Sequence, residues 1–229
     1  INVDASRQDE QKEDILKELE FVTPGAWNTD DRRMPMWGES NEVTTLTSTT
    51  KFPTVQMFRS VARIHVVLSD DLITANDYEL MTVAVHNHNK YGLAVPYAAN
   101  YSTVSRSVAS PSVTDQSTWR DAGPMYHPIP SETGKFVRTI YLSEYDNGFF
   151  SSEEHKMCLT VRLSYQGGTA KWYKIPLVDS NTLTQLDILR NHRYVVTIKN
   201  VVGEGYPSAT EAFEGSIKLS ADVIPWDEN

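Results

Sequence analysis

The sequence predicts an all-β protein with a few short helices. Val, Thr, Ser and Tyr are frequent, and 11 glycines and 11 prolines supply many turns. β-Branched and aromatic residues favour strands, whereas Gly and Pro favour the connections between strands. Only one stretch, near the N-terminus, has the spacing of an amphipathic helix. A chain of 229 residues has room for one large β domain or two small ones.

The charge balance narrows the classes of partner. The chain carries 21 Lys and Arg against 30 Asp and Glu, a net charge of −9. Phosphate binding needs clustered basic residues, so we expect no nucleic-acid partner. No apolar run approaches the ~20 residues that a membrane helix needs. The single cysteine, Cys158, excludes an intramolecular disulfide.

The N-terminal part contains the predicted helix. Ser6 is a candidate N-cap, and acidic residues crowd positions 9–14, where the helix dipole favours negative charge. Ile15, Leu16 and Leu19 form a narrow apolar stripe, and the Pro and Gly of residues 23–25 end the helix. Because the sequence begins with Ile1 and shows no signal peptide, we expect a processed or truncated product.

Apolar residues then alternate with polar ones, which is typical of half-buried strands. The first strand covers residues 55–68, with a bulge near Arg59 and Ser60 where the apolar positions change parity. A second strand covers residues 78–86. Residues 97–122 are rich in Ser, Thr, Ala and Asn, and we interpret them as a long excursion or an interdomain connection.

Strands follow one another regularly after residue 136. They are predicted at residues 136–142, 157–165, 173–177, 194–198 and 217–223. Gly167 and Gly168 favour a hairpin turn, and Pro176 favours a sheet edge. Ser208 and Glu211 have the spacing of a capping box before a short helix. Strands at this spacing, without long helices, indicate β-sandwiches.

Candidate metal and nucleophile sites are weak. His86 and His88 are spaced like metal ligands, but no nearby residue completes a tetrahedral set, so a polar turn is the better interpretation. Cys158 needs a neighbouring His to act as a nucleophile, and His155 lies on the opposite strand parity. The glycines at 203 and 205 lack the strand and helix of a dinucleotide site.

Two other sets of side chains are better explained without a catalytic or binding role. Glu144 with Asp146, or Glu153 with Glu154, resembles a hydrolytic carboxylate pair, but acidic loop residues are usually only solvated. The tryptophans are better explained as buried anchors than as sugar platforms; they include Trp119, Trp172 and Trp226. We therefore predict no catalytic residue, no metal site and no cofactor.

Several motifs, in this order and spacing, resemble the Bacteroidales fimbrillin family, the subunits of type V pili. The densest run comprises residues 189–194, 198–212 and the ending at 223–226. Weaker matches lie at residues 35–38, 59–64 and 140–144. The match is dense over residues 136–229, patchy over 34–96, and weak over 1–33 and 97–130. Family members carry more strand before residue 35.

The resemblance implies a fold and a role. The fold is two transthyretin-like antiparallel β-sandwich domains, with residues 1–122 as an N-terminal domain truncated at its start and residues 123–229 as a C-terminal domain. The role is that of a non-enzymatic subunit of an extracellular fimbrium, exported as a lipoprotein precursor and touching the outer membrane only through that lipid. The implied partners are other fimbrial subunits and ligands on host or bacterial surfaces.

The family resemblance also implies strand exchange, in which a strand of one subunit fills an apolar groove in the next. The terminal strand, residues 217–226, is the candidate donor. Its pocket-filling side chains are the alternate apolar residues Ile217, Leu219, Ala221 and Val223. An equally good interpretation is that this strand completes its own domain, which would suit an accessory or tip subunit.

Two other functions remain open from the sequence. The first is a secreted carbohydrate-binding or adhesin module that does not polymerise, with exposed aromatics such as Trp119, Tyr126 or Tyr145. It predicts a planar row of exposed rings. The second is a hydrolase, which predicts a pocket with paired carboxylates of perturbed pKa.

Overall fold

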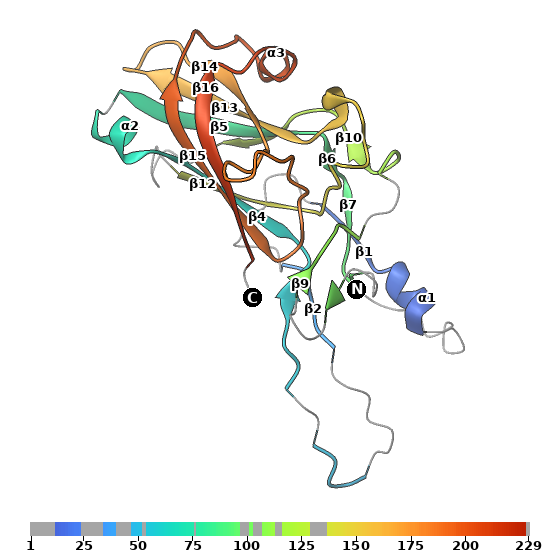
Figure 1. The fold of residues 1–229 in the computed structure, drawn as a ribbon. Helices are drawn as coiled ribbons and strands as arrows, with labels where there is room; N and C mark the ends of the chain where they lie inside the picture. Colours follow the sequence, from blue (N-terminus) through green and yellow to red (C-terminus); the bar gives the residue numbers. More distant parts are fainter. Residues whose placement is uncertain are drawn as a thin grey trace.

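A computed structural model gives the fold (Figure 1). It describes residues 12–23, 34–39, 47–51, 54–75, 77–96, 101–102, 107–112, 116–128 and 137–227. The helices are α1 (Lys12–Lys17), α2 (Asp70–Thr74), α3 (Ala209–Glu214) and the 3-10 helix η3 (Glu153–His155). The strands of the first half are β1 (Glu20–Val22), β2 (Met36–Trp37), β3 (Phe58–Arg59), β4 (Ala62–Leu68), β5 (Tyr78–His86), β6 (His88–Asn89), β7 (Tyr91–Leu93), β8 (Tyr101–Ser102), β9 (Ser107–Val108), β10 (Arg120–Asp121) and β11 (Met125–Pro128). The remaining strands are β12 (Val137–Leu142), β13 (Cys158–Tyr165), β14 (Lys171–Pro176), β15 (His192–Val201) and β16 (Leu219–Asp227).

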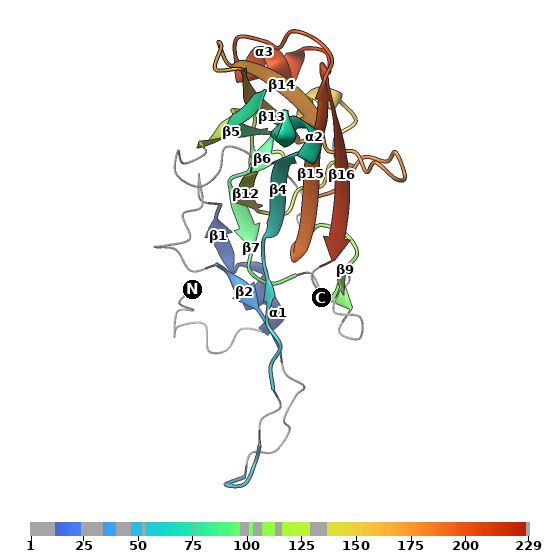
Figure 2. The same ribbon diagram turned by 90° about the vertical axis from the view of Figure 1, so that its left-hand side faces the viewer.

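Two four-stranded sheets form the body of the protein, which confirms the all-β prediction. One sheet has the order β11-β5-β13-β14 and the other has the order β12-β4-β15-β16. Every pairing within them is antiparallel except that of β4 with β15, which is parallel. The two sheets share one buried apolar core (Figure 2).

Strand β4 shows why the sequence pattern works. Its burial alternates along the whole strand, with Ala62, Ile64, Val66 and Leu68 facing the core. Such alternation buries one face of a sheet and leaves the other partly solvated. The predicted strand over residues 55–68 is interrupted at Ser60 and Val61, near the predicted bulge, and its earlier part pairs with β2 instead.

The predicted boundary between residues 122 and 123 runs through this sandwich. Strand β4 is hydrogen-bonded to β12 and β15, and β5 is hydrogen-bonded to β11 and β13. Strands from both sides of the boundary therefore share one core, and in the part of the chain that the structure describes the boundary does not separate two sandwiches. Periodicity identifies strands but not their partners, because pairings such as β4 with β15 connect residues far apart in sequence.

Local predictions hold to different degrees. Helix α1 ends at Lys17, earlier than predicted, because Glu20–Val22 forms β1 against β7; Ser6 lies outside the described residues. The hairpin after β13 is present, with positive φ at Gln166 and Gly167. Strand β14 is an edge strand, as Pro176 predicted. The capping box at Ser208 is confirmed: its hydroxyl accepts the amide hydrogen of Glu211 at 3.2 Å.

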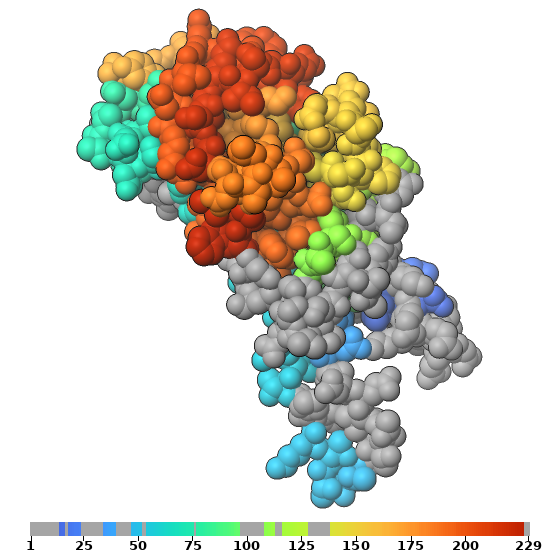
Figure 3. Space-filling model, in the orientation of Figure 1, coloured from blue at the N-terminus to red at the C-terminus, as the bar shows by residue number. Residues whose placement is uncertain are grey.

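An extended segment leaves the body near the start of β4. Residues 47–51 and 54–57 lie well away from the two sheets (Figures 1 and 3). Val55 and Met57 are exposed there. The segment therefore adds nothing to the shared core.

Candidate functional site

The C-terminal strand β16 lies at the edge of its sheet, beside β15. Nine residue pairs join the two strands, with one register shift near Ile198 and Asn200. Three of the four predicted donor residues lie in β16: Leu219 and Val223 are buried in the core, and Ala221 packs against it. Ile217 precedes the strand and is 53% exposed.

In this structure the strand therefore completes its own sandwich. This is one of the two arrangements that the sequence left open, and it leaves the donor role as a prediction. Of the polar residues between the apolar ones, Ser220 is exposed, whereas Lys218 and Asp222 are half-buried. Asp222 pairs with Lys199 of β15 at 3.1 Å on the outer face.

One residue fastens the outer edge of β16. The hydroxyl of Ser180 accepts the amide hydrogen of Val223 at 2.8 Å, and the amide of Ser180 donates to the carbonyl of Val223 at 3.0 Å. Ser180 belongs to the turn after β14, where the Asp179 carboxylate accepts from the amide of Asn181 at 2.7 Å. We call the two bonds between Ser180 and Val223 the serine clasp. It covers the edge of β16 at one position.

A shallow groove lies beside the clasp, between β14 and the start of β16. Its volume is about 240 Å³, and its walls are mostly apolar. Leu183 and Ile217 stand at its rim, both strongly exposed, and Ile175 and Leu219 form part of its floor. The groove places the first predicted donor residue, Ile217, at an open apolar surface.

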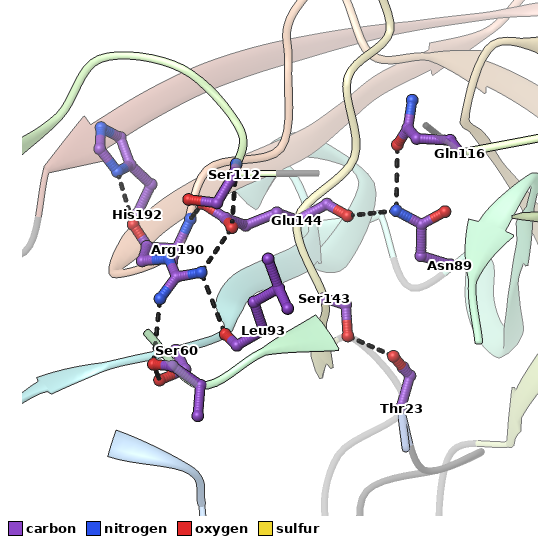
Figure 4. A network of polar contacts seen from close by, with 11 residues as sticks. Thr23, Ser60, Asn89, Leu93, Ser112, Gln116, Ser143, Glu144, Arg190 and His192 are labelled. Carbon is purple, nitrogen blue, oxygen red and sulfur yellow. Dashed lines mark hydrogen bonds and ion pairs between the residues drawn. The ribbon is translucent and has the colours of Figure 1, made fainter. Parts of the chain in front are cut away.

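A buried ion pair lies at the end of the sandwich where β4 and β15 begin (Figure 4). Arg190 Nη2 lies 2.7 Å from Glu144 Oε2, and the two side chains are 0% and 2% exposed. The guanidinium also donates to the carbonyl oxygens of Leu93 at 3.0 Å and Ala94 at 3.1 Å. The hydroxyl of Ser60 donates to the same Ala94 oxygen at 2.6 Å. Arg190 thus joins the end of β7 to the beginning of β15.

The contacts of Glu144 extend this network. Its carboxylate accepts from the amide of Ser112 at 3.3 Å and from the amide of Arg190 at 3.4 Å. Its backbone carbonyl accepts from Asn89 Nδ2 at 2.7 Å, and Asn89 also donates to Gln116 Oε1 at 3.0 Å. We call these five residues the polar knot: Asn89, Ser112, Gln116, Glu144 and Arg190. It connects loops that are distant in sequence, and the burial pattern of the strands does not predict these contacts.

The sequence singled out Glu144 as a candidate carboxylate and within the family motifs, and Arg190 within those motifs, but it did not indicate that the two form a pair. A usable signal was present: each charged residue lies two positions from a strand end, Leu142 or His192. A charge so close to a buried strand needs a partner, because an unpaired buried charge is costly. Neither residue is placed to act on a ligand, since both are enclosed.

Two of the candidate metal and nucleophile residues, His86 and Cys158, are buried parts of the sandwich. His86 bonds Thr160 at 3.0 Å, and its pKa is lowered to about 4, mainly by burial. His88 lies on the following strand, β6, after the positive-φ residue Asn87. Burial raises the pKa of Cys158 to about 12, so the thiol stays protonated. Among the described residues, no group of three or more His, Cys, Asp or Glu is placed to hold a metal ion.

The candidate carboxylates and aromatic rings are also dispersed. Glu144 forms an ion pair with Arg190. Glu153 pairs with Lys156, and Glu154 lies beside His155. Of the three candidate rings, Tyr145 is buried, Trp119 is half-buried and Tyr126 is 49% exposed. In the described part of the chain, no helix has the length and apolar character to cross a membrane.

Comparison with known proteins gives a family and a set of similar folds. The model of the fimbrillin-A associated anchor proteins Mfa1 and Mfa2 matches residues 5–229. No curated protein matches the chain. Among solved structures, the chain is similar to a candidate cell adhesion protein from Parabacteroides distasonis, with 15% identity, a TM-score of 0.42, and coverage of 76% of this chain and 60% of that one.

Two further structures are similar at the same level. A candidate cell adhesion protein from Bacteroides uniformis has 11% identity and a TM-score of 0.43, with coverage of 85% of this chain and 66% of that one. The tip fimbrial protein Mfa3 from Porphyromonas gingivalis has 16% identity and a TM-score of 0.39, with coverage of 74% and 52%. The chain therefore spans between about half and two thirds of the length of these proteins.

Proposed function

We propose that this chain, which belongs to the family of fimbrillin-A associated anchor proteins Mfa1 and Mfa2, is a structural or adhesive subunit of a bacterial surface fimbrium without enzymatic activity. The family makes it a fimbrial, adhesion-related protein of the cell surface. Its partners are other fimbrial subunits. Export as a lipoprotein precursor to the outer membrane is part of the same proposal.

The proposed assembly step is exchange of β16 between subunits. One observation carries it: among the described residues, β16 is the outer strand of its sheet and is bonded to another strand, β15, on one side only. An edge strand can leave its sheet while the ladders between the other strands stay intact. Its place can then be filled by the equivalent strand of a second copy, which restores every contact.

The energetics support this step. Main-chain hydrogen bonds to β15 supply affinity, and Leu219 and Val223 supply specificity by filling core positions. An empty edge beside β15 would expose a row of unpaired amides and carbonyls, so the vacated site favours rapid refilling. Ile217, exposed at the rim of the groove, adds apolar contact with a neighbouring subunit.

A reversible disulfide tests the proposal. Thr197 and Asp222 are cross-strand partners on β15 and β16, at a separation that suits a disulfide. We expect the double variant Thr197→Cys/Asp222→Cys to stop subunit mixing when oxidised and to restore it when reduced. Mixing is measured by energy transfer between two batches labelled at their N-termini. Native Cys158 is buried and does not interfere.

The matched control locks the other side of the sheet. His65 and Thr139 are partners on β4 and β12, so His65→Cys/Thr139→Cys should leave mixing unchanged when oxidised. Equal mixing of the oxidised and reduced Thr197/Asp222 variant would contradict exchange of β16. Absence of any mixing by the unmodified chain would contradict it as well.

A further inference from the structure

A second hollow lies away from β16, beside the polar knot. Its volume is about 460 Å³, within the range of about 300–1,000 Å³ that is typical of small-ligand sites. Strands β1 and β7 form one wall and the segment from β10 to the start of β11 forms the other. The side chains that matter for its chemistry are His88, Lys90, Tyr91 and Asp121.

One aromatic ring at the hollow is held in place from behind. Tyr91 is 37% exposed, and its ring meets that of Trp119 edge-on, with centroids 5.9 Å apart and planes at 69°. The backbone of Lys90 is fixed on both sides, because its amide donates to the carbonyl of Trp119 at 2.8 Å and its carbonyl accepts from Thr23 at 2.7 Å. The ring is therefore a preorganised apolar surface facing the hollow.

Polar groups stand beside this ring. His88 is 9% exposed, and its buried Nδ1 has no hydrogen-bond partner among the residues that the structure describes. Burial lowers the pKa of His88, so the ring is neutral at neutral pH. Asp121 is the cross-strand partner of His88, and its Oδ1 accepts from the amide of Gly123 at 2.9 Å, which orients the carboxylate. Buried polar atoms normally have partners, so this Nδ1 is a hydrogen-bonding group that the described residues leave unused.

We propose that this hollow binds a neutral saccharide unit. A pyranose ring presents an apolar face of C–H groups, which suits the Tyr91 ring, and an edge of hydroxyls, which suits a carboxylate and an imidazole. The opposite charges of Lys90 and Asp121 leave no net charge to attract a strongly ionic ligand. The site would give the proposed fimbrial subunit an adhesive specificity. Only this biological role depends on the proposed function; the binding of a saccharide does not.

The test measures binding of simple sugars to the unmodified chain. The probes are methyl β-D-galactoside, methyl α-D-mannoside and N-acetylglucosamine at about 10 mM, well above a millimolar Kd, followed by saturation-transfer NMR. We expect at least one to bind. Tyr91→Ala should weaken that binding at least tenfold, Asp121→Asn about tenfold, and Tyr91→Phe less than threefold. A thermal melt checks that each variant is folded.

The chain offers a closely matched control. Tyr126 is 49% exposed and also meets a tryptophan edge-on, with 5.7 Å between its centroid and that of Trp172. It lies outside the lining of the hollow, so Tyr126→Ala should leave sugar binding unchanged. Equal losses for Tyr91→Ala and Tyr126→Ala, or no response to any of the three sugars, would overturn the proposal. Subunit mixing is a separate measurement, so failure of one proposal does not imply failure of the other.

Discussion

Strands β4 and β16 flank the same strand, β15, and both bury alternate apolar side chains, but their other sides differ. Strand β4 pairs with β12 over six residue pairs, and the polar knot lies at its beginning. In the part of the chain that the structure describes, no further strand lies beyond β16 in its sheet. The serine clasp covers its outer edge at Val223.

The difference teaches that burial alone does not decide which strand can move. Val66 of β4 and Val223 of β16 are both almost fully buried. Releasing β4 would break two ladders and disturb the ion pair, whereas releasing β16 breaks one ladder and the clasp. Regions that open locally are those with fewer such constraints. On this account, β16 is the separable part of the sandwich and β4 belongs to its permanent part.

The largest expected effect comes from breaking the polar knot on the permanent side. Arg190→Met leaves Glu144 buried without its partner, and such a change costs about 3–5 kcal/mol. We expect the unfolding free energy, measured by urea denaturation, to fall by that amount. The carbonyls of Leu93 and Ala94 lose donors at the same time.

The double variant Arg190→Met/Glu144→Leu distinguishes charge from packing. Replacing both members of a buried ion pair by apolar residues is often neutral. We therefore expect the double variant to recover most of the lost stability. If it were as unstable as Arg190→Met, the knot would act through its shape and its bonds to the loops, not through the unpaired charge.

A matched pair of valines compares the two strands directly. Val66→Ala and Val223→Ala each remove two buried carbon groups, for an expected loss of about 2 kcal/mol. Only Val223→Ala should also speed subunit mixing, because it weakens the strand that leaves. Faster mixing by Val66→Ala, with no change for Val223→Ala, would reverse the roles assigned to β4 and β16.

The serine clasp offers a smaller change at the edge itself. Ser180→Ala removes the acceptor of the Val223 amide, and one such bond is worth about 1 kcal/mol. Mixing should therefore become faster by up to about fivefold. Ser164→Ala is the control, since Ser164 donates to the carbonyl of Gly168 in a hairpin away from β16. A similar acceleration by both variants would show that the clasp is not specific.

The smallest expected effect is a pH dependence of folding stability that arises from His65 in β4. Burial, with Arg193 and Arg63 nearby, lowers the pKa of His65 below its ordinary 6.5. The unfolded chain therefore binds a proton at His65 more readily than the folded chain does. The contribution of neutral His65 to folding stability is present above pH 6.5 and is lost as the pH falls below 6.5. We expect His65→Gln to flatten the fall in stability between about pH 7 and about pH 5 by less than about 1 kcal/mol. An unchanged slope would exclude His65 as a contributor.

Much of the sandwich could be predicted from the sequence, because alternation is a local property of the chain. The strands near residues 62–68, 158–165 and 192–201 follow from it, as does the capping box at Ser208. The arrangement of the strands could not be predicted in this way. The parallel pairing of β4 with β15 joins residues that no periodicity connects, so the strand pattern gave no argument against a division at residue 122.

For the candidate sites too, local patterns could be predicted from the sequence and long-range contacts could not. The apolar positions of β16 were correctly identified from their spacing, but its place at a sheet edge depends on the whole topology. The partnership of Arg190 with Glu144, the clasp at Ser180 and the hollow beside Tyr91 are all long-range contacts between polar residues in loops. Such residues carry no period, and only the folded structure brings them together.

Hydrogen exchange on the monomer is the most direct measurement of the central claim, that β16 can leave while the rest of the sandwich stays folded. The account predicts that amides of residues 219–226 exchange through an opening of lower free energy than those of Ala62–Leu68, which should exchange only on global unfolding. Equal opening free energies for the two strands, both matching global unfolding, would contradict it.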